Sequence, residues 1–394
     1  MRLYREAEFT ESRSLRIFCG TWNVNAKKQE GGLNDWLLPK EHGLADVYAI
    51  GFQEMVDLNA MNVAIDSSKS QQRSQFWQGC IVECLQSTGS GFALVAEKHL
   101  VGLLLVVYVR ESLLGYVKDV RVASTGVGLM GMMGNKGGVS VRMSLYDTAV
   151  CFVCAHLAAH RENVAGRNAD FKNIMERTLL TTADASAVET ATTADAVTVV
   201  RPRYGAARYL DVDVTIPDHD LILWVGDLNY RIVEGIPTED VFNKIDVNDL
   251  ASLRDLDQLN LERVKGAVFE GFEEGILNFA PTYKFQPGTD LYERRAEKKL
   301  RAPAWCDRVL WRTVRPGSVR LLNYRCSTLR PSDHKPVSAL LDTDLRVVVA
   351  SKELDVYTSL KNTLEFWRNA ETPVAEVTGY PVDMVNVKYN VSSD

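Results

Sequence analysis

A carboxylate and an amide directly follow the apolar run Asp220–Val225. The run has the length and composition of a buried strand, and a side-chain period of two places Asp227 and Asn229 on one face. A carboxylate can take a proton from water while a neighbouring amide holds the oxygen, which is one way to activate water for attack. The same Asp-x-Asn spacing also forms simple turns, so the motif alone leaves both interpretations open.

A second polar cluster combines His334, within Ser332–Pro336, with Asp307, which precedes the expected strand Arg308–Trp311. A carboxylate on one imidazole nitrogen fixes the tautomer and leaves the other nitrogen free to donate to an anionic phosphate. A single histidine is more often structural than catalytic, so this pairing depends on the fold that brings the two residues together.

Asn23, Glu54 and His156 also lie just past apolar runs, where a rigid scaffold can hold catalytic side chains in place. Glu54 is the candidate ligand for Mg²⁺, because that ion is held by one or two carboxylates together with substrate phosphate. His156 and His160 have the spacing of a zinc-protease helix. No Glu follows the first histidine and the pair follows a strand, so the sequence disfavours zinc.

The elements that must position these residues are short strands with a few helices between them. Strands are expected at Leu15–Trp22, Asp46–Gly51, Val101–Arg110, Val117–Ser124, Gly138–Leu145, Ala149–Ala155, Asp220–Val225, Arg308–Trp311, Val319–Tyr324 and Val337–Leu341. Helices are expected at Ser67–Gln86, Asn163–Leu180, Pro237–Ile245 and Asn248–Val264. Meandering strands with interspersed helices favour a layered α+β sandwich over a doubly wound parallel sheet.

The composition is that of a globular protein, with 394 residues, 46% hydrophobic and 24% charged. Its formal charge of −6 argues against a nucleic-acid partner.

Seven cysteines show no framework spacing, and Cys151 and Cys154 should point to opposite faces of one strand, as buried thiols in a reducing compartment. The polar start has no signal-peptide core, and no apolar run is long enough to span a bilayer. We therefore expect a cytoplasmic protein.

Two segments depart from this pattern. Thr181–Val200 is almost entirely Ala, Thr and Val with scattered acids, which is typical of an inserted loop. Beyond residue 344, the helix-like Val356–Trp367 precedes the β-like Val382–Tyr389, and these residues are expected to start a further domain. The expected organisation is an N-terminal extension over 1–14, a main domain over 15–344 and a C-terminal extension over 345–394.

Nine short motifs occur in an order that resembles the inositol polyphosphate 5-phosphatases. They are Thr21–Asn23, Gly51–Glu54, Gly134–Gly138, His156–His160, Arg167–Asp170, Gly226–Asn229, Pro281–Lys284, Pro303–Arg308 and Ser332–Pro336. The resemblance covers about residues 15–344. It implies the deoxyribonuclease-I-like endonuclease/exonuclease/phosphatase fold, a four-layer α/β sandwich with two central mixed or antiparallel sheets flanked by helices. The type II group is the most similar, and there the catalytic domain continues into an ASPM–SPD-2–Hydin (immunoglobulin-like) domain.

The resemblance also implies roles for the polar residues at the strand ends. Asp227 would be the general base for the attacking water, Asn229 would orient that water, and His156 would hold a scissile phosphate oxygen. His334, paired with Asp307, would stabilise the transition state. Such an in-line displacement depends mainly on positioning and charge stabilisation.

The implied metal site is a Mg²⁺ site at Glu54, with Asn23 beside it and Asp333 as a further carboxylate on the metal side. The implied substrate contacts are Tyr283, Lys284 and Arg301 for the ring 4-phosphate, Lys136 towards the 1-phosphate, and Asn168. A basic run at 294–299 precedes the Pro303–Arg308 motif, although such runs are usually solvated faces.

The glycine-spaced apolar stretch 126–134 is either a buried turn or an exposed loop that touches lipid. In lipid-cleaving members of the family the corresponding loop contacts acyl chains, so Leu129, Met130, Met132 and Met133 are expected to contact the membrane. We therefore favour phosphatidylinositol 4,5-bisphosphate and 3,4,5-trisphosphate as substrates, with soluble inositol polyphosphates as further candidates.

Two other functions compete with this one. A nuclease or sphingomyelinase of the same superfamily would share the Asp-x-Asn and Asp-His core, but would not explain Pro281–Lys284 together with Pro303–Arg308. A catalytically idle trafficking scaffold would not need the complete catalytic set. The expectation is a cytoplasmic enzyme, peripheral at cytosolic membrane faces, with transient membrane contact and trafficking proteins as partners. The oligomeric state is left open.

Overall fold

The computed structural model describes residues 5–39, 41–57, 67–127, 136–181 and 212–369. They form two compact units. One unit is Arg13–Leu345, which contains the predicted catalytic residues, and the other comprises the described parts of Met1–Ser12 and Arg346–Asp394. The apolar loop residues Leu129, Met130, Met132 and Met133, nearly all of the expected insertion 181–200 and the β-like stretch 382–389 lie outside the described residues.

The first six-stranded sheet has the order β13-β14-β1-β2-β4-β3. Its strands are β1 (Thr10–Asn23), β2 (Val47–Gln53), β3 (Phe92–Leu100), β4 (Leu103–Arg110), β13 (Val319–Cys326) and β14 (Val337–Val348). The central pair, β1 and β2, is parallel, so both strands end at the same edge with Asn23 opposite Gln53. Every residue of β2 is buried, because the strand is covered on both faces.

The second six-stranded sheet has the order β11-β12-β10-β7-β6-β5. Its strands are β5 (Val117–Gly126), β6 (Gly137–Leu145), β7 (Thr148–His156), β10 (Leu221–Asp227), β11 (Glu273–Glu274) and β12 (Asp307–Thr313). The central strands β7 and β10 are parallel, and β12 runs antiparallel to β10. A separate two-stranded ribbon pairs β8 (Leu179–Leu180) with β9 (Val214–Thr215).

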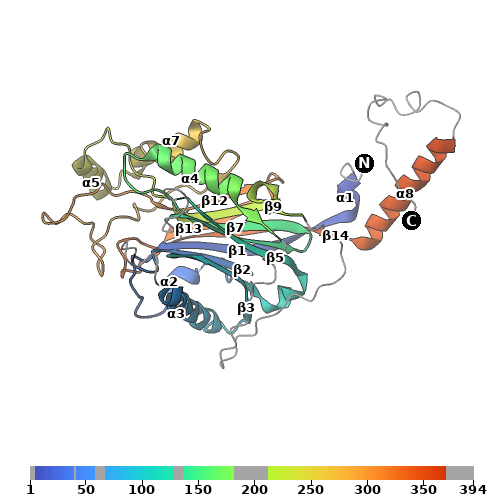
Figure 1. Cartoon of the computed structure of the whole chain (residues 1–394), viewed down its shortest axis with the longest axis horizontal. Coiled ribbons are helices and arrows are strands. Elements are labelled where there is room, and N and C mark those ends of the chain that lie inside the picture. Colours follow the sequence, from blue (N-terminus) through green and yellow to red (C-terminus); the bar gives the residue numbers. More distant parts are fainter. Residues whose placement is uncertain (1–4, 40, 58–66, 128–135, 182–211, 370–394) are drawn as a thin grey trace. The chain divides into compact units, whose positions relative to one another are not determined.

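Helices cover the outer faces of both sheets (Figure 1). On the first sheet, α2 (Asn34–Leu37) and α3 (Ser67–Gln86) contribute Trp36, Trp77 and Ile81 to one apolar cluster with the strands. On the second sheet, α4 (Val164–Arg177) and α7 (Gln258–Val264) contribute Phe171, Ile174 and Leu259 to another. Two further helices are α5 (Thr238–Asp246) and α6 (Leu250–Asp255), and η2 (Glu111–Tyr116) and η5 (Ile216–Asp218) are short 3₁₀ helices. The predicted four-layer sandwich is confirmed.

A third apolar cluster fills the space between the two sheets, with Ile17, Val107, Val141 and Leu223 among its residues. The sheets approach closely at Gly51, where a Cβ atom would lie 2.7 Å from the sulfur of Cys154. Cys154 belongs to this inner cluster, whereas Cys151 belongs to the outer cluster under α4. The two cysteines therefore point to opposite faces of β7, as predicted, and all seven cysteines are free.

In the other unit, α1 (Glu6–Phe9) packs against α8 (Ala350–Asn369). The Val349 amide donates to the Phe9 carbonyl at 2.8 Å, and Lys352 pairs with Glu11 at 3.0 Å. The expected helix Val356–Trp367 is the inner part of α8. Among the described residues, no helix combines the length and apolar character that a membrane span requires.

Several elements differ from the sequence expectation. The helix expected over Asn163–Leu180 ends at Arg177, and Leu179–Leu180 forms strand β8 instead. Strand β3 was not predicted, because its sequence has no regular alternation of apolar and polar residues. In the structure its burial is correspondingly irregular, with a register shift between Leu94 and Ala96. The expected helix Asn248–Val264 is two helices, since Asp257 accepts a hydrogen bond from the Asn260 amide at 3.0 Å and caps α7 as a new helix. Strand β1 begins at Thr10, before the expected start at Leu15.

Candidate active site

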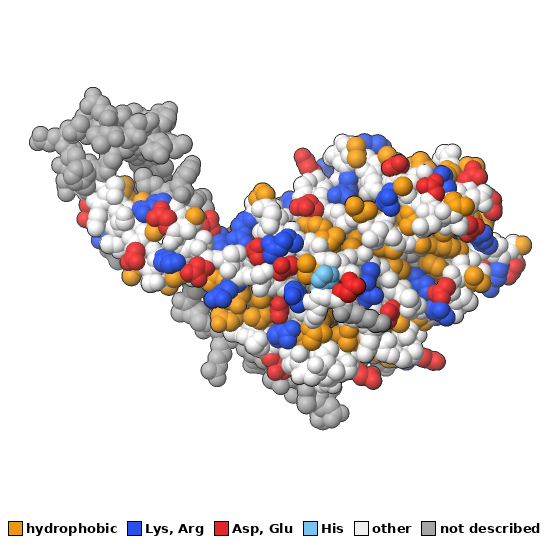
Figure 2. Space-filling model, turned by 180° about the vertical axis from the view of Figure 1, so that it is seen from behind, with side chains coloured by type: hydrophobic (Ala, Val, Ile, Leu, Met, Phe, Trp, Pro, Cys, Tyr) orange, Lys and Arg blue, Asp and Glu red, His pale blue; other side chains and the backbone are white. Residues whose placement is uncertain are grey.

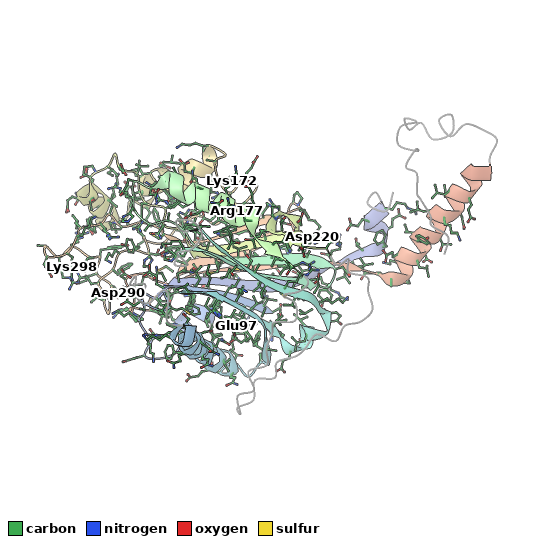
Figure 3. The ribbon with its side chains drawn as sticks, in the orientation of Figure 1. Glu97, Lys172, Arg177, Asp220, Asp290 and Lys298 are labelled. Carbon is green, nitrogen blue, oxygen red and sulfur yellow. The ribbon has the colours of Figure 1, made fainter. Side chains whose placement is uncertain are left out.

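Three of the predicted catalytic residues form one row across the second sheet. Asp227, the last residue of β10, lies in register with His156 at the end of β7 and with Asp307 at the start of β12. Gly226 makes this row possible, because it has φ +152° and a Cβ there would lie 2.0 Å from the Ala155 carbonyl oxygen. The row lies at the end of the strands opposite Asp220, towards the loop that carries Asp290 and Lys298 (Figure 3).

Asn23, at the end of β1, links the first sheet to this row of residues on the second sheet. Its Nδ2 donates to Asp227 Oδ2 at 2.9 Å, while its Oδ1 accepts from the Asn25 amide at 3.0 Å. Glu54 directly follows β2, the strand parallel to β1, and has φ +51°. The ends of both sheets therefore contribute polar side chains to one site.

Asp227 is almost fully buried and anionic. Burial alone would raise its pKa, but His334, His156 and Lys136 together hold that pKa well below its usual range. Its second oxygen, Oδ1, accepts from the Asn229 amide at 3.1 Å, and Asn229 Nδ2 donates to the Leu157 carbonyl at 3.0 Å. Asn229 thus holds the carboxylate mainly through its backbone.

His334 forms the predicted pair with Asp307, with Nδ1 2.9 Å from Asp307 Oδ2. The Thr282 hydroxyl donates to the same oxygen at 2.7 Å. Burial opposes a charge on the imidazole, but Asp307, Asp227 and Asp333 outweigh it and raise the pKa of His334 to about 10. His334 is therefore protonated near neutral pH, with Nε2 3.9 Å from Asp227 Oδ2.

His156 differs from His334 in its charge state. Its Nε2 lies 3.3 Å from Asp227 Oδ2 and contacts Lys136 Nζ, while its buried Nδ1 has no hydrogen-bond partner among the described residues. Burial and the Lys136 charge lower the pKa of His156, so this imidazole is neutral. Burial also lowers the pKa of Lys136 itself, although Asp227 and Glu54 oppose that effect. His156 lies on a strand and His160 in a loop with φ +80°, which is not the helical arrangement of a zinc-protease pair.

The carboxylate of Glu54 is suited to a cation. It is 31% exposed, and the neutral His156 places Nε2 3.7 Å from Oε1. Within the described ranges no hydrogen bond is found for this carboxylate, whereas Asp227 and Asp307 each accept several. Glu54, His156 and Asp227 place ligand atoms within 4.8 Å of one another, an arrangement that can hold a divalent ion.

The predicted 4-phosphate residues lie beside His334. The Tyr283 ring is 4.5 Å from the His334 ring, and its hydroxyl accepts from Arg301 at 3.0 Å. Lys284 Nζ lies 2.6 Å from Asp333 Oδ2. Asp333 is therefore paired with a lysine and belongs to neither of the clusters that could hold a metal among the described residues, and its predicted metal role stays a prediction.

Asn168 lies on α4, with both ends of its amide bonded within the protein. Its Nδ2 donates to Glu262 at 2.7 Å, and its Oδ1 accepts from the Tyr230 hydroxyl at 2.7 Å. Part of the basic run is neutralised in a similar way, since Arg294 pairs with Asp246 at 2.8 Å and Arg295 with Glu293. Substrate contact by Asn168 stays a prediction.

The structure adds two residues to which the sequence assigned no role. Thr282 lies within the Pro281–Lys284 motif and bonds Asp307, and Trp22 donates from Nε1 to the His334 carbonyl at 3.0 Å. Both residues belong to recognised motifs, so position in a motif was the available signal.

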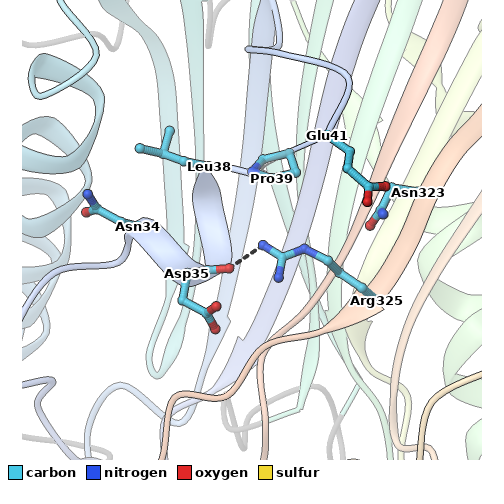
Figure 4. Close-up of a pocket in the computed structure, with 7 residues that line it drawn as sticks. All are labelled: Asn34, Asp35, Leu38, Pro39, Glu41, Asn323 and Arg325. Carbon is cyan, nitrogen blue, oxygen red and sulfur yellow. Dashed lines mark hydrogen bonds between the residues drawn. The ribbon is translucent and has the colours of Figure 1, made fainter.

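A cavity of about 610 Å³ lies away from these residues, between α2 and β13 (Figure 4). Arg325 reaches across it to the Asp35 carbonyl, and the Asp35 carboxylate accepts from Ser327 at 2.6 Å and from the Thr328 amide at 2.8 Å. These bonds hold the segment that leads into the loop carrying His334.

The two packed sheets with polar residues at their strand ends agree with the comparisons to known proteins. A profile of the Endonuclease/Exonuclease/phosphatase family 2 matches residues 20–340. The chain is 36% identical over 358 residues to a synaptojanin of Caenorhabditis elegans, covering 86% of this chain and 29% of the relative. It is 34% identical over 387 residues to the type II inositol 1,4,5-trisphosphate 5-phosphatase of Mus musculus, covering 98% and 35%. It thus spans about a third of the length of these two relatives.

Two further comparisons cover most of both chains. The type I inositol polyphosphate 5-phosphatase 8 of Arabidopsis thaliana is 34% identical, over 84% of this chain and 71% of the relative. The crystal structure of the inositol polyphosphate 5-phosphatase domain of SPsynaptojanin, in complex with inositol (1,4)-bisphosphate and calcium ion, matches with a TM-score of 0.74 and 31% identity, over 94% of this chain and 96% of that one. The chain belongs to the inositol polyphosphate 5-phosphatases, a family of phosphoric monoester hydrolases.

Proposed function

We propose that this protein hydrolyses the 5-phosphate of phosphatidylinositol polyphosphates, such as the 4,5-bisphosphate and the 3,4,5-trisphosphate, and of soluble inositol polyphosphates. The observation that carries the proposal is the row His156–Asp227–Asp307, with Asn23 bonded to its central carboxylate. The family membership supplies the substrate class. A nuclease would share the row but would not need the group of Tyr283, Lys284 and Arg301 beside it.

In the proposed reaction, Asp227 accepts a proton from the attacking water, whose oxygen forms a bond to phosphorus as the bond to the ring oxygen breaks. The ring oxygen keeps the electron pair of that bond and takes a proton from solvent water, which leaves a free hydroxyl on the ring. Asn23 and Asn229 hold the two carboxylate oxygens in place, so little reorganisation is needed at the moment of attack. Protonated His334 donates Nε2–H towards the developing phosphoryl charge, and Asp307 fixes its other nitrogen. Neutral His156 can donate to a second phosphoryl oxygen.

Glu54 is the proposed principal ligand of a Mg²⁺ ion, with Asn23 beside it. The observation that supports this role is a partly exposed carboxylate, next to Asp227 and His156, that makes no hydrogen bond to any residue the structure describes. When bound, the ion would neutralise phosphate charge in the transition state. The related SPsynaptojanin domain was crystallised with a calcium ion, which is consistent with an oxygen-rich cation site.

Lys284 and Arg301 are the proposed ligands of the ring 4-phosphate, with Tyr283 between them. Lys284 pairs with Asp333 at 2.6 Å, so a 4-phosphate would share the ammonium group with that carboxylate. Burial would lower the pKa of Lys284, but Asp333 outweighs it and raises that pKa, so the lysine is charged when the substrate arrives. Lys136, beside His156, is the proposed contact on the 1-phosphate side.

Contact with lipid is proposed through Leu129, Met130, Met132 and Met133, in a peripheral enzyme at cytosolic membrane faces that meets trafficking proteins. Acidic and basic side chains are interspersed on the face seen in Figure 2, which supports brief rather than tight adhesion to anionic lipid. Replacing the three methionines with serine should impair cleavage of long-chain lipid more than cleavage of its soluble head group. Equal losses on both substrates would contradict this part of the proposal.

The proposed activity is tested by phosphate release from 5-phosphorylated inositol phosphates and phosphoinositides, with Mg²⁺ and with chelator. Asp227→Asn, which keeps the size of the side chain, is the inactive control and should lower kcat by on the order of a hundredfold or more, with KM changed less. Absence of release from every 5-phosphorylated compound would contradict the proposal, as would full activity in the Asp227→Asn variant.

A further inference from the structure

Arg231 is buried next to the candidate active site, although the reaction described above gives it no role. Its Nε donates to the Asn229 carbonyl at 3.1 Å, and a terminal nitrogen donates to Asn229 Oδ1. The planar guanidinium thus holds the backbone and the side chain of Asn229 together. Asn229 has φ +57°, a left-handed backbone conformation that Asn adopts more readily than most other non-glycine residues, and the two bonds from Arg231 fix the residue in it.

Asn229 transmits this restraint to the catalytic row. Its amide donates to Asp227 Oδ1 at 3.1 Å, and its Nδ2 donates at 3.0 Å to the carbonyl of Leu157, the residue after His156. A shift of Arg231 would therefore move Asn229, and Asn229 would move the carboxylate that is proposed to take the proton.

The guanidinium of Arg231 also packs on the Tyr283 ring, 4.4 Å from the ring centroid. Tyr283 itself contacts the His334 ring at 4.5 Å and accepts a hydrogen bond from Arg301 at 3.0 Å. Arg231 is consequently in contact with both halves of the site. One half holds the proposed base and the other holds the proposed 4-phosphate ligands.

We propose that Arg231 is a positioning residue that couples recognition of the ring 4-phosphate to the placement of Asp227. This inference rests on the proposed function, because it assumes a 4-phosphate at Tyr283 and Arg301. A phosphate held there restrains the Tyr283 ring, the ring restrains the guanidinium, and the guanidinium restrains Asn229 and its bond to Asp227. A lysine has no planar fork and cannot pack on the ring while it makes both bonds to Asn229.

The test compares the wild type with Arg231→Lys, Tyr283→Leu and the double variant on inositol 1,4,5-trisphosphate and inositol 1,5-bisphosphate. In Arg231→Lys we expect kcat on the trisphosphate to fall by about tenfold or more, with a smaller change in KM. The preference for the substrate with a 4-phosphate should fall in the same variant. The losses of the two single variants should not add in the double variant, because they break one chain of contacts.

Arg121→Lys is the matched control. Arg121 lies on the edge strand β5 and is also buried, but it donates to the carbonyls of Leu180 and Val212. It should leave kcat and the 4-phosphate preference unchanged. Thermal unfolding checks that each variant folds, and Arg231→Gln replaces the lysine variant if that one does not.

Additive losses, an unchanged preference in Arg231→Lys, or a wild type without any 4-phosphate preference would each overturn the coupling. A wild type that releases no phosphate from either substrate would instead contradict the proposed function.

Discussion

Asn23 Nδ2 donates to Asp227 Oδ2 at 2.9 Å, and this bond joins the ends of the two sheets. Asn23 ends β1 of the first sheet and Asp227 ends β10 of the second. The bond leaves the carboxylate in contact with His156 on its own sheet and near His334, which lies in the loop before β14 of the first sheet. The position of the proposed base therefore depends on both sheets at once.

Asn23→Ala should lower kcat by about ten- to a hundredfold, because a hydrogen bond to a charged group contributes about 1.5–3 kcal/mol. Steady-state kinetics on a soluble substrate measure the effect. Thr21→Val is the control, since it removes a buried bond to Gln53 two residues earlier on the same strand. An Asn23→Ala loss no larger than the Thr21→Val loss would show that the bond to Asp227 does not matter for catalysis.

Glu54→Gln should weaken the response to Mg²⁺ while leaving the fold intact. The substitution keeps the shape of a side chain that has no hydrogen bonds within the described residues, so the melting temperature should change little. The Mg²⁺ concentration for half-maximal activity should rise by about tenfold or more. An unchanged Mg²⁺ titration would place the ion elsewhere.

Asp307→Asn should change the pH dependence. In the wild type the pKa of His334 is raised to about 10, so the charged imidazole persists below that pH and is lost above it. Removing the Asp307 charge lowers that pKa, and the alkaline limb of the kcat/KM profile should move to lower pH by about one unit or more. Thr282→Val removes a hydrogen bond to Asp307 but no charge, and should shift the limb less. A limb that does not move would mean that His334 is not the group that titrates.

Gly226→Ala should destabilise the protein, because the new Cβ would lie 2.0 Å from the Ala155 carbonyl oxygen at φ +152°. Overpacking of this kind costs about 1–3 kcal/mol, which a lower melting temperature would report. At Gly235 a Cβ meets nothing within 4 Å, so Gly235→Ala should be tolerated. Equal melting temperatures for the two variants would contradict this account of the β10 end.

The sequence predicted most of the strands that carry the site, because apolar runs that end in a polar residue are local features. It therefore placed Asp227, His156 and Asp307 at strand ends before their register was known. It did not predict β3, whose burial alternates irregularly. Nor did it predict the break between α6 and α7, where the Asp257 cap interrupts an otherwise helical pattern.

Contacts between distant segments could not be predicted from spacing. The pair of Lys284 and Asp333 joins residues 49 positions apart, and Asn168 is bonded to Glu262 and Tyr230. Arg231 lies two residues after the Gly226–Asn229 motif, but its contact with Tyr283 exists only in the folded chain. Motif order reveals which residues form the site, whereas the partner of each side chain depends on tertiary packing.

The central claim is the position of the phosphate that is removed. The most direct test is to identify the product that the protein with Mg²⁺ forms from inositol 1,4,5-trisphosphate, using phosphorus NMR or separation of the isomers. The account predicts inositol 1,4-bisphosphate as the product, formed more slowly by on the order of a hundredfold or more in the Asp227→Asn variant. A different bisphosphate isomer, or no product from the wild type, would contradict it.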